Sequence, residues 1–307
     1  MNRRDFFQTG TFLGAGLLAG GAFAPRLSAQ TTAESDQRAA AKLRISSQLG
    51  IIPADSIPAK LEKMKNWGCE AVEWGGDVVA KAAECRKMAD DAGLESSAIC
   101  WGSHNGDLCS EDESKRQPGV DDLKKAIEAA GILGARGVIY VPAFNGQTKL
   151  TNQEIRARCL EFLPDVAAFA VEHKTHVIFE PLCRMEAYFL RQVADGASIC
   201  RDINEAGGNG GMALMGDFYH MWTEETSDMG AFISGGSYLQ HVHLAGGTQD
   251  PRRTLPGQNS RTFVDGFRGL KYIGYQQFCS FECGVVGDKE VEIPKSITYL
   301  KAQWDAA

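Results

Sequence analysis

The sequence predicts an α/β protein, a single closed (β/α)8 barrel of the TIM type, and three observations support this fold class. Short apolar runs rich in β-formers occur eight times, their starts lie 23 to 43 residues apart, and segments with helical periodicity separate them. This repeat length is typical of a barrel in which a helix follows each strand. The expected strands cover residues 44–49, 71–74, 94–101, 137–142, 176–181, 212–217, 239–245 and 277–283.

The expected helices occupy the intervals between these strands. In one of them Leu123, Ile127 and Ala130 recur at helical spacing, and Gly134 follows as a C-cap. Near-continuous apolar strands indicate a parallel sheet buried on both faces, and eight repeats favour closure into one barrel. An open doubly wound sheet is the alternative, but no glycine-rich phosphate-binding loop follows an early strand. The expected helices cover residues 57–67, 79–92, 120–133, 152–173, 189–206 and 266–274.

The first 43 residues are expected to lie outside the barrel, which takes residues 44–307. Residues 1–29 have the pattern of a twin-arginine signal peptide, with the pair Arg3 and Arg4, an apolar glycine-rich stretch, and small residues before Gln30. A membrane anchor is the alternative, but the apolar stretch is short for a bilayer and is interrupted by glycines. Residues 30–43 are expected to form a flexible tether. The sequence therefore predicts a protein that is periplasmic or otherwise exported, with no stable membrane insertion after signal cleavage.

The composition restricts the classes of partner. The chain has 307 residues, of which 44% are hydrophobic and 23% charged, and its formal net charge is −7. This balance excludes a disordered or low-complexity protein. The negative charge argues against a nucleic-acid or anionic-membrane partner, because both select for a basic face.

Four acidic or histidine side chains fall near the ends of four consecutive expected strands. Glu180, Asp217, His243 and Glu282 take these positions in strands five to eight. Catalytic groups of a barrel gather at the carboxyl ends of its strands, and a carboxylate there is costly to bury unless it is paired or metal-bound. We therefore expect these four residues to bind one divalent cation. The oxygen-rich donor set suits Mn²⁺, Mg²⁺ or Co²⁺ better than it suits a structural zinc.

Two glutamates beside a divalent cation also form a proton-shuttling pair. The cation makes the hydrogen on the carbon beside a substrate carbonyl acidic, so that one of Glu180 and Glu282 removes it and the other returns it elsewhere. His241 points to the same face of its strand as His243, and we expect it to support the site or fill the barrel interior rather than bind the metal.

Several motifs resemble the sugar phosphate isomerase/epimerase superfamily of xylose-isomerase-like TIM barrels. They are FEPL at 179–182 with Arg184 and Glu186, GDFYHM at 216–221, HVHLA at 241–245, PG at 256–257, IGY at 273–275 and SFECG at 280–284. Within this superfamily the sequence is similar to hydroxypyruvate isomerases and to ketose 3-epimerases of the D-tagatose/D-psicose type. The resemblance covers roughly residues 44–287, with its specific motifs after Val177.

The resemblance implies a divalent-metal enzyme, usually Mn²⁺-dependent, whose ligands match the four residues above and whose acid/base pair matches the two glutamates. It implies that Glu186 and His220 touch substrate hydroxyls near the reacting carbonyl. It also implies an arginine soon after the seventh strand, for which Arg252 and Arg253 are the candidates. Homo-oligomers are common in the superfamily, so self-association is expected on the same ground.

Two aromatic side chains are candidates for the wall of a sugar pocket. Trp101 ends the third expected strand, and His104 lies shortly after it. Their ring faces are suited to apolar sugar surfaces at the top of a barrel, although aromatic residues there are equally often part of the packing. Both remain candidates for substrate binding.

Three functional hypotheses follow. The first is an isomerase or epimerase acting on a keto sugar or a related hydroxy-carbonyl compound. The second uses the same metal and base as a 3-oxo-glycoside lyase, in which enolisation toward C2 expels the aglycone from C1 by β-elimination. The third, a non-catalytic sugar-binding subunit, is disfavoured because all four ligand candidates are intact. A DNA-repair endonuclease is disfavoured because it needs a histidine-rich multi-zinc cluster and a basic face.

Overall fold

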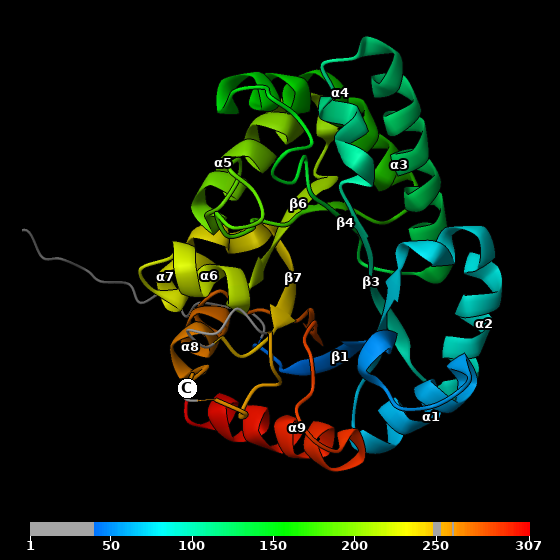
Figure 1. The fold of residues 1–307 in the computed structure, drawn as a ribbon, viewed down its shortest axis with the longest axis vertical. Coiled ribbons are helices and arrows are strands. Elements are labelled where there is room, and N and C mark those ends of the chain that lie inside the picture. Colours follow the sequence, from blue (N-terminus) through cyan, green and yellow to red (C-terminus); the bar gives the residue numbers. More distant parts are fainter. Residues whose placement is uncertain (1–39, 248–252, 260) are drawn as a thin grey trace, which may run out of the picture. The chain divides into compact units, whose positions relative to one another are not determined.

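Eight parallel strands form a closed barrel in the computed structural model of the chain, which describes residues 40–247, 253–259 and 261–307 (Figure 1). Each strand pairs with the next in sequence, and β8 closes on β1. The expected (β/α)8 barrel is confirmed. The strands are β1 (Arg44–Gln48), β2 (Ala71–Gly75), β3 (Glu95–Gly102), β4 (Val138–Tyr140), β5 (Val177–Phe179), β6 (Met212–Asp217), β7 (Leu239–Leu244) and β8 (Phe278–Phe281).

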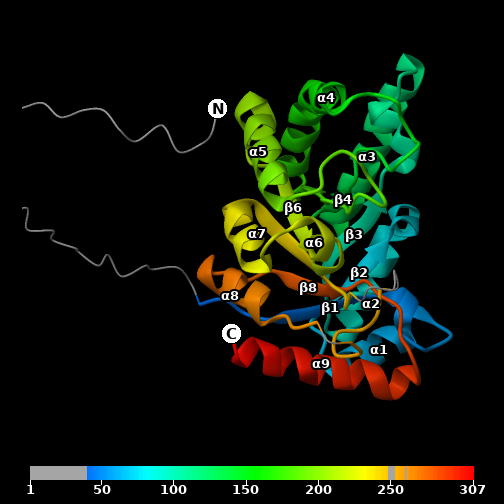
Figure 2. The ribbon, with the colours of Figure 1, turned by 60° about the vertical axis from the view of Figure 1, so that its left-hand side comes forward.

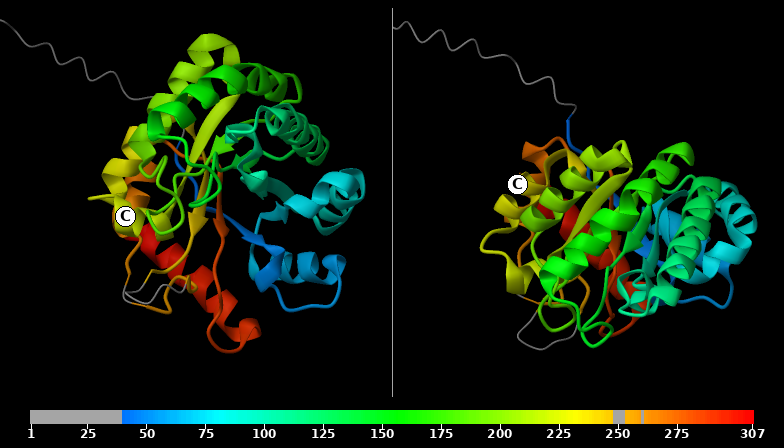
Figure 3. Two further views of the ribbon diagram at one scale, coloured as in Figure 1. Left: turned by 45° about the horizontal axis from the view of Figure 1, so that its top comes forward. Right: turned by 90° about the horizontal axis from the view of Figure 1, so that it is seen from above.

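Helices surround the barrel and follow the expected order. The C-terminal α9 lies against both α1 and α8, so it closes the ring of helices at the seam between β8 and β1 (Figures 2 and 3). The helices are α1 (Ile57–Trp67), α2 (Ala82–Ala92), α3 (Glu113–Leu133), α4 (Asn152–Glu172), α5 (Val193–Ile203), α6 (Phe218–Glu224), α7 (Asp228–Gly235), α8 (Val264–Tyr272) and α9 (Lys289–Asp305). Within the parts of the chain that the structure describes, no helix is both long and apolar enough to cross a bilayer.

Several helices differ from the expected ones, and three of these differences are the largest. α3 begins at Glu113 rather than at residue 120, because the Asp112 carboxylate accepts a hydrogen bond from the Ser114 amide and caps the helix ahead of Pro118. α5 begins four residues later than expected, at Val193. The structure also adds α6, α7 and α9, which the sequence analysis did not predict. The expected signal peptide and residues 30–39 of the expected tether lie outside the described residues.

The barrel interior has an apolar and a polar half. We call one group of inward side chains from β3 to β6 the apolar half; it consists of Ala98, Ile139, Ile178, Ala213 and Met215. We call the group that faces it the polar half. Its side chains are fully buried and come from β1, β2, β3, β7 and β8; they are Ser46, Glu73, Ser97, His241 and Ser280. Alternate residues of the same strands face outward and pack under the helices, as Val72 and Trp74 do.

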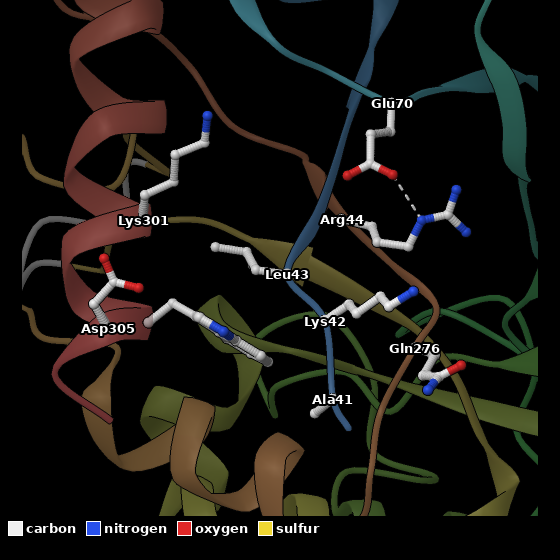
Figure 4. A pocket seen from close by; sticks show the side chains of 9 residues that line it. Ala41, Lys42, Leu43, Arg44, Glu70, Gln276, Lys301 and Asp305 are labelled. Atoms are coloured by element: carbon white, nitrogen blue, oxygen red, sulfur yellow. Dashed lines mark hydrogen bonds and ion pairs between the residues drawn. The ribbon is translucent and has the colours of Figure 1, made fainter. Parts of the chain in front are cut away.

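A cavity of about 630 Å³ lies at the amino-terminal end of the barrel (Figure 4). Lys42, Arg44, Glu70 and Lys301 are among its lining residues, and the Arg44 guanidinium donates a 2.8 Å hydrogen bond to Glu70. None of the four expected metal ligands lines this cavity. Because barrel enzymes place their chemistry at the opposite, carboxyl-terminal end of the strands, we locate the candidate site there.

Candidate active site and metal centre

Four side chains from four consecutive strands meet at the carboxyl end of the barrel. Glu180 directly follows β5, Asp217 ends β6, His243 lies on β7 and Glu282 directly follows β8. One potential ligand atom from each residue lies within 4.8 Å of the others. Nδ1 of His243 is 3.0 Å from Oε2 of Glu282, 3.3 Å from Oε1 of Glu180 and 3.9 Å from Oδ2 of Asp217. The structure thus brings together all four residues that the sequence analysis expected to bind a metal, here called the ligand cluster.

The ligand cluster leaves buried polar atoms without hydrogen bonds. Oε1 of Glu180, Oδ2 of Asp217 and Nδ1 of His243 form no hydrogen bond among the described residues, although Arg253 makes an ion pair with Oδ2 of Asp217 at 2.9 Å. Buried polar atoms are almost always hydrogen-bonded, and buried charges are costly unless a counter-charge compensates them. A divalent cation would satisfy all three atoms at once, and carboxylate oxygens with one imidazole suit Mn²⁺, Mg²⁺ or Co²⁺. The residues present therefore fit a bound divalent cation.

The electrostatics of His243 support the same conclusion. Burial alone lowers the pKa of this imidazole, but the charges of Glu73 and Glu180 and the hydrogen bond to Glu73 outweigh burial and raise the pKa well above its ordinary value. Without a metal, the surrounding carboxylates thus favour a positive charge on His243. A divalent cation supplies that charge when His243 binds it through a neutral ring.

The local fold explains why Asp217 presents one oxygen to the ligand cluster. Asp217 is the N-cap of α6, and its Oδ1 accepts a 2.7 Å hydrogen bond from the Tyr219 amide. This bond fixes the carboxylate and leaves Oδ2 facing His243 and the other ligands. The same helix carries His220, so the turn at Asp217 sets the positions of two site residues.

Glu73 lies on β2 and holds the histidines of β7, a position that the sequence analysis did not assign. Its fully buried carboxylate is 2.7 Å from Nε2 of His241 and 3.1 Å from Nε2 of His243. Burial raises the pKa of Glu73, but the His243 charge and the two imidazole hydrogen bonds outweigh this and hold the pKa well below its usual value. Glu73 alternates with the outward-facing Trp74, and this alternation was the signal in the sequence that could have placed it inside the barrel.

Gln48 connects Glu73 to the ligand cluster. It ends β1 beside Glu73 in the strand register, and its Nε2 donates to Oε1 of Glu73 at 2.8 Å and to Oε1 of Glu282 at 3.1 Å. The thiol of Cys100 lies 3.8 Å from the same Glu282 oxygen. Neither Gln48 nor Cys100 belongs to a recognisable motif, so their role emerges only from the closed barrel.

Three of the residues expected to bind substrate flank the ligand cluster. Nη1 of Arg253 lies 2.9 Å from Oδ2 of Asp217, and the guanidinium also contacts the Glu282 carboxylate and Nε2 of His220. Nδ1 of His220 accepts a 3.0 Å hydrogen bond from the Cys183 amide and lies 4.0 Å from Oε1 of Glu186. Arg252, the other expected arginine, lies outside the described residues.

An ion pair anchors the segment that carries Glu186. The Arg184 guanidinium binds the Glu224 carboxylate with two hydrogen bonds, of 2.8 and 3.0 Å, and the Arg184 amide donates a third. Glu224 ends α6, so this bidentate pair ties the loop after β5 to the helix that bears His220. Glu186 and His220 are thereby held on the same side of the ligand cluster.

Trp101 and His104 lie apart from these residues. Their rings stack on each other at 4.9 Å between centroids, and His104 lies within 3.6 Å of Asp107 and 3.5 Å of Asp122. Within the described parts of the chain, neither ring makes a hydrogen bond, ion pair or ring contact with the ligand cluster. Their participation in substrate binding remains a prediction.

A second cavity, of about 450 Å³, opens beside the ligand cluster. Gln48, Glu73, Cys100 and Glu282 line it together with residues of α1 and of the segment after β2. Small-molecule sites are concave and commonly enclose about 300–1,000 Å³, so this cavity has the volume of such a site. Glu282 is the one member of the ligand cluster that lines it.

Comparison with known proteins places the chain in a family. Residues 61–303 match the family model described as the xylose isomerase-like TIM barrel, so the chain belongs to that family. The expected resemblance is thus confirmed at the level of the family.

Individual relatives are sugar epimerases. The chain is 25% identical over 259 residues to 3-dehydro-D-guloside 4-epimerase of Escherichia coli, a match that covers 78% of this chain and 92% of the relative. It is also 25% identical over 225 residues to D-psicose 3-epimerase of Agrobacterium fabrum, covering 70% and 75% of the two chains. Among solved structures, 3-keto-D-glucoside 4-epimerase from E. coli superposes with a TM-score of 0.74 at 23% identity, over 85% of this chain and 100% of that one.

Proposed function

We propose that this protein is a divalent-metal-dependent isomerase or epimerase of a keto sugar or a related hydroxy-carbonyl compound. One observation carries the proposal: Glu180, Asp217 and His243 meet beside the carboxylate of Glu282, and their buried ligand atoms lack hydrogen bonds. The sugar epimerases among the relatives support the same class of reaction.

The ligand cluster would hold the metal, for which we propose Mn²⁺, with Mg²⁺ or Co²⁺ as alternatives. When bound, the metal supplies a Lewis acid that polarises the substrate carbonyl and stabilises the negative charge of an enediolate. His243 contributes a nitrogen ligand, and the three carboxylates contribute oxygens.

Glu180 and Glu282 are the proposed acid/base pair. They reach the ligand cluster from β5 and β8, with β6 and β7 between them, so the two carboxylates approach a substrate from different directions. One carboxylate removes the proton from the carbon beside the carbonyl, and the other delivers a proton to the opposite face or to the neighbouring carbon. The first outcome is epimerisation and the second is isomerisation.

Arg253, His220 and Glu186 are the proposed substrate-binding residues. Arg253 is cationic and lies against Asp217 and Glu282, where it can donate to substrate oxygens next to the reacting carbon. Because Nδ1 of His220 accepts a backbone hydrogen bond, the ring is fixed with Nε2 toward the ligand cluster. Glu186 is more exposed and can accept from a substrate hydroxyl.

A proton-exchange assay tests this proposal. Metal-loaded protein is incubated in D₂O with D-fructose, D-psicose, D-tagatose and hydroxypyruvate, and the products are followed by NMR. Interconversion with deuterium at the reacting carbon is expected, and chelation of the metal should stop it. Absence of both interconversion and deuterium uptake for every substrate would contradict an isomerase or epimerase of these compounds.

A 3-oxo-glycoside lyase is the second candidate. The observation in its favour is the E. coli relative, whose name denotes an oxidised glycoside as its substrate. Removal of the proton at C2 of a 3-oxo-glycoside gives an enediolate that expels the aglycone from C1, and the same glutamates would serve. Release of aglycone from a 3-oxo-glucoside without any ketose interconversion would favour the lyase over the isomerase.

We further propose that residues 1–29 direct export by the twin-arginine route. The support is the pair Arg3 and Arg4 followed by an apolar, glycine-rich stretch. Cell fractionation of the full chain tests this, with Arg3→Lys/Arg4→Lys as the matched variant that keeps the charge. Equal export of both forms would contradict the twin-arginine route.

A further inference from the structure

We propose that Glu73 and Gln48 position the ligand cluster, Glu73 by fixing the ring of His243 and Gln48 by fixing the carboxylate of Glu282. Both act through other residues, so they are positioning residues and not catalytic ones. The inference deepens the proposed function and rests on it, because it presumes that the ligand cluster binds a metal.

The carboxylate of Glu73 receives three donors from two other strands, β7 and β1. Nε2 of His241 lies 2.7 Å from its Oε2, Nε2 of His243 lies 3.1 Å from each of its oxygens, and Nε2 of Gln48 lies 2.8 Å from Oε1. The carboxylate is fully buried. A buried carboxylate with three donors is well compensated and has little freedom to rotate.

The consequence for His243 is a defined ring orientation. When Nε2 carries the proton that it donates to Glu73, the lone pair of the neutral ring is on Nδ1, the atom that faces Glu180 and Glu282 at 3.3 and 3.0 Å. Metal-binding histidines usually donate their other ring N–H to a carboxylate in this way, which fixes the tautomer and the direction of the ligand atom.

His241 also holds the carboxylate of Glu73 and packs against His243. Its ring packs edge-to-face against that of His243, with 5.2 Å between centroids and 85° between planes. Each ring thus limits the movement of the other while both are bonded to Glu73. His241 thereby supports the metal site without reaching it.

Gln48 extends this support to Glu282. Its single amide nitrogen lies within hydrogen-bond distance of Glu73 at 2.8 Å and Glu282 at 3.1 Å, so its two hydrogens bridge two carboxylates that would otherwise repel each other. Because Oε1 of Glu282 is held by Gln48, Oε2 is the oxygen that faces Nδ1 of His243. Gln48 therefore holds one oxygen of Glu282, a residue proposed both to bind the metal and to move the proton, while Arg253 contacts the other oxygen.

Direct measurement of metal affinity tests the Glu73 part of the inference. Metal-free wild type, Glu73→Gln and Ser97→Ala are titrated with Mn²⁺, and free Mn²⁺ is measured by electron paramagnetic resonance. Glu73→Gln is expected to weaken Mn²⁺ binding by about 10- to 100-fold, the usual effect of losing the partner of a metal-binding histidine. Ser97→Ala is the matched control, because it removes a buried polar group bonded to Ser46 at 2.8 Å that does not touch the ligand cluster. It should bind Mn²⁺ as the wild type does, even where its melting temperature falls.

Several outcomes would overturn the inference. Wild-type Mn²⁺ affinity in Glu73→Gln would do so, and so would a Ser97→Ala protein that loses as much affinity as Glu73→Gln. If Glu73→Gln does not fold, Glu73→Asp is measured instead, because it keeps the charge but moves it away from the rings of His241 and His243. Wild-type Mn²⁺ affinity in Glu73→Asp would also overturn the inference. A wild type that binds none of Mn²⁺, Mg²⁺ and Co²⁺ would instead refute the proposed function, on which the inference rests.

Steady-state kinetics test the Gln48 part. Gln48→Ala at saturating Mn²⁺ is expected to lower kcat by about 10-fold or more while KM changes little, and to weaken Mn²⁺ binding less than Glu73→Gln does, because it disturbs the proposed base more than the histidine ligand. A wild-type kcat in Gln48→Ala, or a loss confined to the melting temperature, would refute a positioning role for Gln48.

Discussion

The apolar and polar halves of the barrel interior are built from the same kind of strand but perform different tasks. The apolar half contributes only aliphatic and thioether side chains, among them Ile139, Ile178 and Met215. The polar half contributes Glu73, His241 and three serines, which are equally buried. Burial of apolar groups stabilises a fold, whereas burial of polar groups costs free energy unless each finds a partner.

The polar half is the part of the barrel interior in which buried groups need partners, and some of these partners belong to the candidate site. In the polar half, Glu73 is bonded to His241 and His243, and Ser46 to Ser97. The first of these networks leads directly to the ligand cluster. We therefore expect substitutions in the apolar half to change stability alone, and substitutions around Glu73 to change metal binding as well.

The largest expected effect falls where the polar half meets the ligand cluster. Glu282→Gln should lower kcat by about 100- to 10,000-fold at saturating metal, the usual contribution of a general acid or base, while substrate affinity is largely retained. Single-turnover kinetics and substrate titration measure the two quantities separately. Near-normal turnover in this variant would show that the proposed acid/base pair is wrong.

A substitution in the apolar half tests whether that half affects stability without affecting metal binding. Ile178→Ala should lower the free energy of unfolding by about 2–5 kcal/mol, because it removes buried methyl groups and leaves a cavity. Urea unfolding measures this loss, and Mn²⁺ titration of the folded variant should give the wild-type affinity. A loss of affinity as large as that expected for Glu73→Gln would remove the distinction between the halves.

Metal loading should stabilise the whole barrel through the ligand cluster. At a free Mn²⁺ concentration of about 100 times Kd, the free energy of unfolding should rise by about 2.7 kcal/mol, since the unfolded chain does not assemble the four ligands. Urea unfolding with Mn²⁺ and with chelator measures this difference. Asp217→Ala, which lacks one ligand, should gain less, and identical curves for the wild type under both conditions would contradict a metal site.

The smallest expected effect concerns the serine pair of the polar half. Ser97→Ala should cost about 1–3 kcal/mol of stability, because it leaves a buried hydroxyl of Ser46 without its partner. The double variant Ser46→Ala/Ser97→Ala should cost less than the sum of the single changes, since both polar groups are then absent. Additive losses in this double-mutant cycle would show that the two hydroxyls are not coupled.

The sequence was sufficient to predict the barrel because each strand is marked by local composition. The apolar runs and their spacing identify all eight strands to within a few residues. The helices were less well defined where Pro118 and Gly119 interrupt the pattern of α3, whose cap lies at Asp112. α9 likewise contains Pro294 and was not predicted.

The ligand cluster was predictable for a different reason. Glu180, Asp217, His243 and Glu282 are costly to bury and each lies near a strand end, so their position alone suggested one site. Glu73 and Gln48 could not be assigned in this way, because their role depends on contacts between β1, β2, β7 and β8 that exist only after the barrel closes.

Asp217 has a consequence for how this site can change over evolutionary time. One of its oxygens caps α6 and the other faces the ligand cluster, while His220 lies on the same helix. Loss of the carboxylate therefore removes a proposed ligand, a helix cap and the support of His220, a proposed substrate-binding residue, in a single mutation. Glu186 and Arg253 lie on loops outside α6, so substitutions there leave the Asp217 cap intact.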